Sequence, residues 1–151
     1  MATTVFDGGL RDLTSGAPSG GVPWVSNVYK LTLVTSAYAV SAGALYASQF
    51  SGFELSTASF TAGFGGLMRR TISSRAATLN ATSHYMALTG DPVTWSGISA
   101  GAVGAIVLLR ESGTDALSPV VAYYPVVNVV TAGGDLIVSA PASGFLVVST
   151  G

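Results

Sequence analysis

The longest apolar stretch of the chain lies in residues 91–124 and predicts a β-hairpin. Residues 103–110 read VGAIVLLR, and in an extended segment the odd-numbered residues from Val103 to Leu109 fall on one face and the even-numbered ones on the other. Both faces are therefore apolar until Arg110 ends the run. The polar residues 111–115 then predict a reversal, and residues 117–124 form a second apolar segment of similar length. We therefore expect two buried antiparallel strands at the centre of the fold, and we expect their role to be structural.

Shorter strands are predicted on either side of this hairpin. Alternation starts at residue 27, and Tyr29, Leu31 and Leu33 then share one face of a half-buried strand. Turn-forming residues interrupt the chain about every eight to twelve positions, which is typical of antiparallel sandwiches and barrels of about nine to eleven strands. No segment shows sustained helical spacing, so helix is expected to be a minor component. The further strands are expected at residues 44–50, 53–60, 67–73, 84–88, 126–130, 135–139 and 145–149.

Residues 1–27 differ from the rest and predict an extended N-terminal arm. Their glycines and prolines oppose a long helix or a central strand, but apolar side chains recur among them. Such an arm is expected to lie along its own domain or along a neighbouring subunit, and a partly disordered terminus is the alternative. Residues 28–151 are predicted to form one all-β domain, an antiparallel, jelly-roll-like β-sandwich. The arm residues expected to contact a neighbour are Val5, Phe6, Leu10, Leu13 and Trp24.

Composition limits the classes of function. Of the 151 residues, 9% are charged and 49% are hydrophobic, whereas ordinary soluble domains are about 25% charged. A net charge of −1 provides no basic field for direct nucleic-acid binding. The absence of cysteine removes disulfides and thiolate chemistry. The sequence shows neither a signal-peptide pattern nor an apolar run of about 20 residues, so we expect neither secretion nor a membrane span.

Three features resemble catalytic or ligand-binding motifs but lack the context that those motifs need. Residues 97–101, GISAG, match a nucleophile elbow, but a strand is expected after Ser99, and the only histidine, His84, precedes it. A lone histidine also lacks the further ligands of a zinc or copper site. The glycines of residues 61–66 lack the lysine and the helix of a phosphate-binding loop. We therefore expect no catalytic, cofactor-binding or metal-binding residues; a small hydrolase that uses Ser99 and His84 is the competing hypothesis.

Arg69, Arg70 and Arg75 form the only basic cluster in the sequence. Arg69 and Arg70 point to opposite faces of a strand, so we expect one to face solvent and the other to pair with a carboxylate. Arginine is enriched at protein interfaces because its planar guanidinium makes bidentate contacts with carboxylates. The three arginines are therefore predicted to contribute to a subunit contact rather than to bind nucleic acid.

The order of several short motifs resembles that of small virion proteins of tailed bacteriophages. In those proteins an early lysine-containing strand leads to a glycine-rich turn, a D-P-x-T-W-S segment, an apolar strand, a P-x-x-x-Y strand and a final strand after a proline. The likeness covers residues 29–149, and the glycine-rich arm and the uncharged final strand depart from it. The corresponding segments are YKLTL at 29–33, TAGFGG at 61–66, DPVTWS at 91–96, GAIVLL at 104–109, SPVVAY at 118–123 and PASGFL at 141–146.

The resemblance implies a non-enzymatic β-sandwich component of a phage virion, in the first place a capsid decoration or cement protein that stabilises the head shell. Such a protein would bind the major capsid protein and neighbouring copies of itself as a homo-oligomer, in a virion assembled in the host cytoplasm. No cofactor, direct nucleic-acid contact or membrane is implied. The alternatives are a tail, collar or head-fibre component, or a carbohydrate-binding β-sandwich in which Trp24, Trp95, Tyr123 and Tyr124 stack on sugars.

Overall fold

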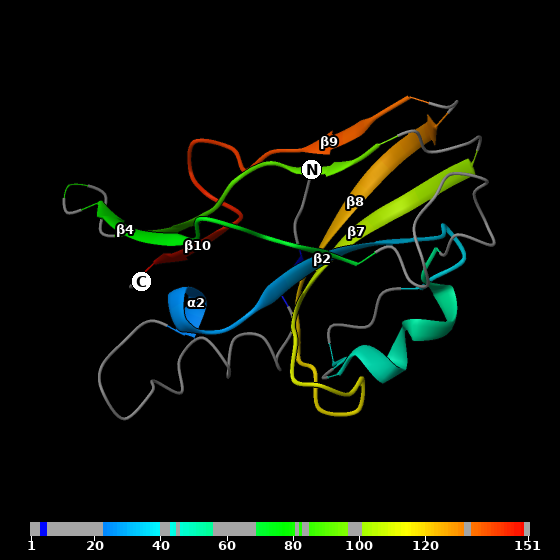
Figure 1. The fold of residues 1–151 in the computed structure, drawn as a ribbon, viewed down its shortest axis with the longest axis horizontal. Coiled ribbons are helices and arrows are strands. Elements are labelled where there is room, and N and C mark those ends of the chain that lie inside the picture. The colour runs from blue at the N-terminus through cyan, green and yellow to red at the C-terminus, as the bar shows by residue number, and fades with distance from the viewer. Residues whose placement is uncertain are drawn as a thin grey trace.

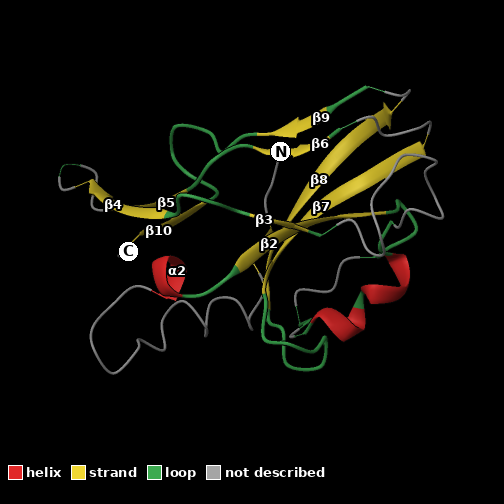
Figure 2. Ribbon diagram, in the orientation of Figure 1, coloured by secondary structure: helices red, strands yellow, loops and turns green. Residues whose placement is uncertain are grey.

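The fold is all-β and antiparallel, as predicted (Figures 1 and 2). The structure is a computed structural model that describes residues 4–5, 23–39, 43–44, 46–55, 69–80, 82, 85–96, 101–131 and 134–149. Helix is limited to α2 (Pro23–Ser26) and two 3-10 turns, η1 (Ala47–Gln49) and η2 (Ser51–Phe53), in these residues. None of the helices described is long and apolar enough to cross a membrane. The strands are β1 (Thr4–Val5), β2 (Tyr29–Val34), β3 (Arg70–Thr71), β4 (Ala76–Asn80), β5 (Tyr85–Thr89), β6 (Val93–Trp95), β7 (Gly101–Arg110), β8 (Val120–Thr131), β9 (Leu136–Val138) and β10 (Leu146–Ser149).

The strands form three sheets in the described part of the chain. A five-stranded sheet has the order β1-β8-β7-β2-β3, a three-stranded sheet the order β10-β5-β4, and β6 pairs with β9. The strands expected at residues 84–88, 135–139 and 145–149 are present as β5, β9 and β10. The jelly-roll arrangement itself stays a prediction. The alanine-rich strand β4 was not predicted, because its sequence AATLN has weak β-propensity and it forms by pairing with β5.

β7 and β8 form the predicted central hairpin, and they lie side by side as the two longest strands (Figure 1). β8 continues through residues 126–130, which the sequence had assigned to a separate strand. Pro125 does not end β8, because it lies beside a register shift between Val103 and Ala105 on β7, where the regular ladder is interrupted. The same shift places Val103 in the same core cluster as Ile106, not on the face of Ala105 as simple alternation had predicted.

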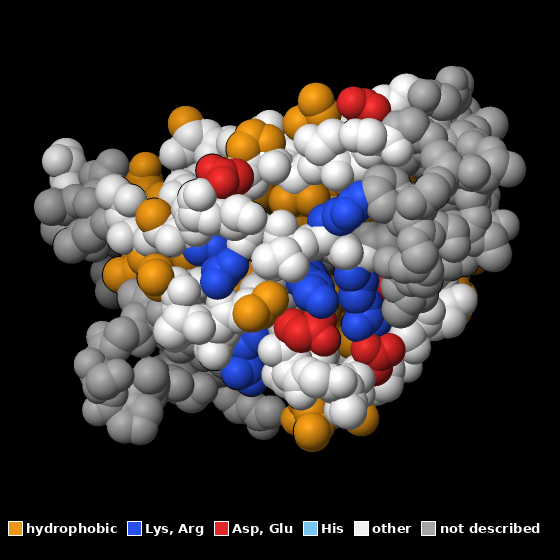
Figure 3. All heavy atoms as spheres, viewed as in Figure 1, with side chains coloured by type: hydrophobic (Ala, Val, Ile, Leu, Met, Phe, Trp, Pro, Cys, Tyr) orange, Lys and Arg blue, Asp and Glu red, His pale blue; other side chains and the backbone are white. Residues whose placement is uncertain are grey.

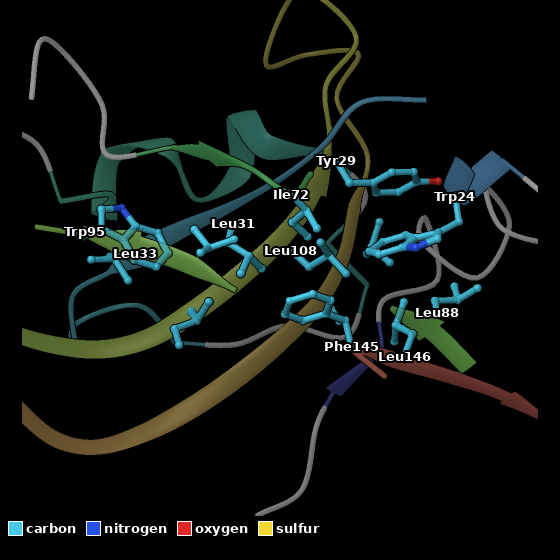
Figure 4. Packing of buried hydrophobic residues seen from close by; sticks show 14 of the residues in the cluster. Trp24, Tyr29, Leu31, Leu33, Ile72, Leu88, Trp95, Leu108, Phe145 and Leu146 are labelled. Carbon is cyan, nitrogen blue, oxygen red and sulfur yellow. The ribbon is translucent and has the colours of Figure 1, made fainter. Parts of the chain in front are cut away.

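Both faces of the five-stranded sheet are buried. The first core joins this sheet to the two smaller sheets, and Figure 4 shows it running from Trp95 and Leu33 at one end to Trp24, Leu88 and Leu146 at the other. Tyr29, Leu31 and Leu33 share this face, as predicted. The members of the first core are Trp24, Tyr29, Leu31, Leu33, Leu55, Ile72, Leu88, Val93, Trp95, Val103, Ile106, Leu108, Val121, Ala122, Phe145 and Leu146.

The second core lies on the opposite face of the sheet, under the segment that carries η1 and η2. Strands had been expected at residues 44–50 and 53–60, and the first of these was wrong, because residues 47–53 form 3-10 turns. Ala47 and Phe50 are buried at a spacing of three, which suits a tight helical turn better than alternation. Residues 56–60 lie outside the described part. The second core consists of Val34, Tyr38, Ala44, Ala47, Phe50, Ala105, Val107, Leu109 and Val120.

Trp24 is a core residue of this chain, although it falls within the predicted N-terminal arm. It lies on α2 and is 0% exposed, and its ring centroid is 4.6 Å from that of Tyr29. Its indole Nε1 donates a hydrogen bond to the Thr89 carbonyl oxygen at 2.9 Å. The domain boundary at residue 27 stays a prediction, but the first core includes a side chain from the N-terminal side of it.

Candidate functional site

An apolar groove of about 670 Å³ lies between β8 and β10. This volume is within the roughly 300–1,000 Å³ range of ligand sites. None of the side chains that line the groove is charged, so it suits an uncharged, apolar occupant. The lining residues are Leu31, Ile106, Tyr124, Pro125, Val126, Val138, Ser139, Pro141, Ser143, Gly144, Phe145, Leu146 and Val147.

Tyr124 has the largest polar side chain in the groove lining, and its hydroxyl already makes a hydrogen bond within the chain. Its hydroxyl donates a hydrogen bond to the Phe145 carbonyl oxygen at 2.5 Å, which joins β8 to the start of β10. Burial raises the pKa of the Tyr124 phenol well above its ordinary value, because the ionised form would lose its hydration. The phenol therefore stays protonated at neutral pH and acts as a structural donor.

Among the described residues, both strands beside the groove have outer edges that are largely unpaired. In this part of the chain, β10 is an end strand of its sheet, and the outer side of β8 carries the two-residue strand β1, opposite Ala122 and Tyr123. Edge strands in natural proteins usually carry charges or prolines that oppose pairing with another chain. β10 reads LVVS and has neither, and its Val147 side chain is 46% exposed. The groove is thus bordered by edges able to accept a further strand.

Arg69 was predicted to take part in a subunit contact, and the structure places it in a buried ion-pair network. Its Nε and Nη2 atoms donate to the two Glu54 carboxylate oxygens at 2.9 and 2.5 Å, and its Nη1 donates to Asp115 Oδ1 at 2.7 Å. Thr32 Oγ1 also donates to Glu54, at 2.7 Å. The Glu54 side chain is 0% exposed and that of Arg69 is 10% exposed. The expected pairing of one arginine with a carboxylate is confirmed for Arg69.

The network has clear electrostatic and mechanical consequences. The hydrogen bonds to Glu54 are the largest cause that raises the pKa of Arg69 above its ordinary value, so this arginine is permanently charged. Glu54, in the segment after η2, is bonded both to Thr32 of β2 and to Arg69, and Arg69 is bonded in turn to Asp115 in the loop between β7 and β8. Oppositely charged side chains lie next to one another on the lower half of the face in Figure 3. Arg69 therefore holds in place the segment with η1 and η2, which covers the second core.

Arg75 is also engaged within the chain. Its Nε donates to the Trp24 carbonyl oxygen at 2.9 Å, and its Nη1 donates to the Ile72 carbonyl oxygen. Arg70 lies on β3 opposite Leu31 and is half-buried. A subunit contact of these arginines stays a prediction, and the structure assigns Arg69 and Arg75 an intrachain role in addition.

Other predicted site residues lie in the core or outside the described residues. Stacking on a sugar needs an exposed ring face, but Trp24 and Trp95 are both 0% exposed. Tyr123 lies against Tyr38, with ring centroids 6.0 Å apart. The backbone of Val5 is described in β1, but its side chain is not. Phe6, Leu10, Leu13, His84, Ser99 and the glycine-rich turn at 61–66 lie outside the described residues.

The described residues include no group of three or more histidines, aspartates or glutamates placed to hold a metal ion. In comparisons with known proteins, no family model, curated protein or solved structure matches the chain. The likeness to virion proteins of tailed bacteriophages therefore rests on the order of the short sequence motifs.

Proposed function

We propose that this protein is a non-enzymatic structural protein of a tailed-bacteriophage virion, of the capsid decoration or cement type. It binds the outside of the head shell through the major capsid protein and through neighbouring copies of itself. The observation that carries the proposal is the uncharged groove between two poorly covered strand edges, in a chain with only 9% charged residues. Lasting protein interfaces are apolar at their centre and depleted in charge.

Exposed apolar side chains also support a role in contact rather than in chemistry. Large apolar side chains are exposed at several separate places, including Leu117 in the β7–β8 loop, Ile137 on β9 and Val147 on β10. A repeating shell lets many copies of one protein bind through modest individual contacts, because each contact raises the effective concentration of the next. A low-charge surface with several apolar contacts suits this mode of binding.

Copy number and location in the source particle test the proposal. Purified particles would be analysed by quantitative mass spectrometry and by electron cryomicroscopy. We expect many copies spread over the head shell, retained through density-gradient purification, and heads without the protein should lose their contents at a lower temperature. A few copies at one vertex would overturn the decoration role and favour a tail, collar or head-fibre component. The absence of the protein from purified particles would overturn the virion proposal altogether.

A further inference from the structure

The outer edge of β8 already binds an N-terminal strand. β1 pairs antiparallel with β8, with Thr4 opposite Tyr123 and Val5 opposite Ala122. The next β8 residues along this edge, Tyr124, Pro125 and Val126, line the apolar groove. A strand that continues the register of β1 by a few positions therefore runs alongside the groove. The occupant that this edge selects is an extended, uncharged segment with the pairing register of β1.

The chain length between β1 and the body of the domain allows two sources for that strand. Residues 6–22 separate β1 from α2, and seventeen residues span at most about 60 Å when fully extended. A compact domain of this size has a diameter of about 40 Å, estimated from its expected radius of gyration. The β8 edge of an adjacent copy is therefore within reach of the same N-terminal strand.

We propose that the β8 edge and its groove receive the N-terminal strand of a second copy of this chain, so that two copies exchange β1. An exchanged strand makes the same contacts with its partner as it makes within one chain, so the exchange itself costs little free energy. The exchange also ties the bodies of two copies to each other through residues 6–22. High local protein concentration favours the exchanged form over the closed form, because exchange is an association. This inference does not depend on the proposed place of the protein in a virion.

Introduced cysteines provide a direct test, because the chain has no cysteine of its own. Val5 and Ala122 are register partners, and antiparallel partners have Cα atoms about 4.5–5.5 Å apart, a distance that a disulfide spans. The full-length single variants Val5→Cys and Ala122→Cys would be unfolded, mixed, refolded together and oxidised. A disulfide between them can form only between two chains. The matched control is Val5→Cys mixed with Leu117→Cys, since Leu117 is exposed in the β7–β8 loop.

We expect at least about tenfold more covalent dimer from the partner mixture than from the control mixture on a non-reducing gel, because bound strands hold the two thiols together. Equal dimer yields from the two mixtures would overturn the exchange. The double variant Val5→Cys/Ala122→Cys, oxidised at high concentration, gives a second reading. Covalent dimers support the exchange, whereas a product that consists only of monomers with an internal disulfide contradicts it.

Sedimentation velocity of the unmodified chain decides the matter if a cysteine variant does not fold. We expect a dimer at high concentration that deletion of residues 2–5 converts to monomer, since the deletion removes β1 and its pairing with β8. Ile137→Asp is the control, because Ile137 is 60% exposed and lies on β9, outside the pairing of β1 with β8. A monomer at every concentration, or equal effects of the two variants, would overturn the exchange. These measurements use purified chain without particles, so their failure is distinct from a failure to find the protein on a head shell.

Discussion

The two faces of the five-stranded sheet are buried by different means. The first face is covered by β5, β6 and β10, together with Trp24 from α2, all of which contribute apolar side chains to the first core. The second face is covered by a short segment that follows β2 directly and contains η1 and η2. The cover of the first face comes from distant parts of the sequence, whereas the cover of the second face comes from the segment that follows β2.

The segment that carries η1 and η2 is held by polar contacts in addition to its apolar ones. The Thr35 amide donates to the Phe53 carbonyl oxygen at 3.0 Å, and the Leu55 amide donates to the Leu33 carbonyl oxygen at 2.9 Å. Glu54 lies between Phe53 and Leu55 in the sequence, and its carboxylate binds Arg69. Burying such charges costs solvation free energy, which the paired hydrogen bonds offset. We infer that the first face depends mainly on apolar packing, whereas the second depends on apolar packing together with the ion pair of Arg69 and Glu54.

The substitution Trp24→Ala is expected to have the largest effect, because it opens a cavity in the first core and removes the bond to Thr89. The expected loss is about 4 kcal/mol of unfolding free energy, as for other large buried aromatic residues. Urea denaturation followed by circular dichroism would measure it. The control is Val25→Ala on the same helix, whose side chain is exposed and whose loss should be small. A loss for Trp24→Ala close to that of the control would show that α2 is not part of the core.

Glu54→Ala is expected to cost about 3 kcal/mol, because it leaves Arg69 buried with only Asp115 and leaves the Thr32 hydroxyl without its acceptor. The matched control is Glu111→Ala, which breaks the Lys30–Glu111 ion pair. Lys30 Nζ lies 2.7 Å from Glu111 Oε2, but both side chains are partly exposed. The loss of this pair should therefore cost less than about 1 kcal/mol of unfolding free energy. Similar losses of unfolding free energy in the two variants would contradict the role of the ion pair in holding the second cover.

Asp115→Asn is expected to have the smallest effect, because the Asp115 side chain is 36% exposed and Arg69 keeps both bonds to Glu54. Such partly exposed pairs contribute less than about 1 kcal/mol, and salt screens them. Denaturation in low and high salt would therefore show a small loss that shrinks as salt rises. A loss as large as that of Glu54→Ala would mean that the contact of Arg69 with the β7–β8 loop, and not its contact with Glu54, holds the segment that covers the second core.

Prediction from sequence worked best where the pattern is local. The strand at Tyr29 and the central hairpin were found because alternation and continuous apolar runs are visible in short windows. The same rules failed for Val103, since a register shift changes which face a residue occupies without leaving a mark in the sequence. They also failed for residues 44–50, where Ala44, Ala47 and Phe50 are buried at a spacing of three, which is the period of a 3-10 turn and not that of a strand.

The candidate site was the least predictable part. The groove combines Leu31 with residues of β8 and of the segment around β10, and no local motif links such distant positions. Its only signals in the sequence were the uncharged strands and the proline-containing turn at residues 140–144. The arginine cluster was visible in the sequence, but the partners of Arg69 and Arg75 became known only when the fold brought Glu54, Asp115 and Trp24 beside them.

The sequence alone determined the fold class, the central hairpin and the shortage of charge, because these depend on composition and on the two-residue period of a strand. The central hairpin of β7 and β8 is confirmed, although β8 extends to Thr131 through residues that were expected to form a separate strand. Only the tertiary structure decided which segments cover its two faces, that Trp24 belongs to the core, and that β8 and β10 border one groove. Those features depend on contacts between residues far apart in the chain, where pairing geometry and burial select one arrangement among many that the local pattern allows.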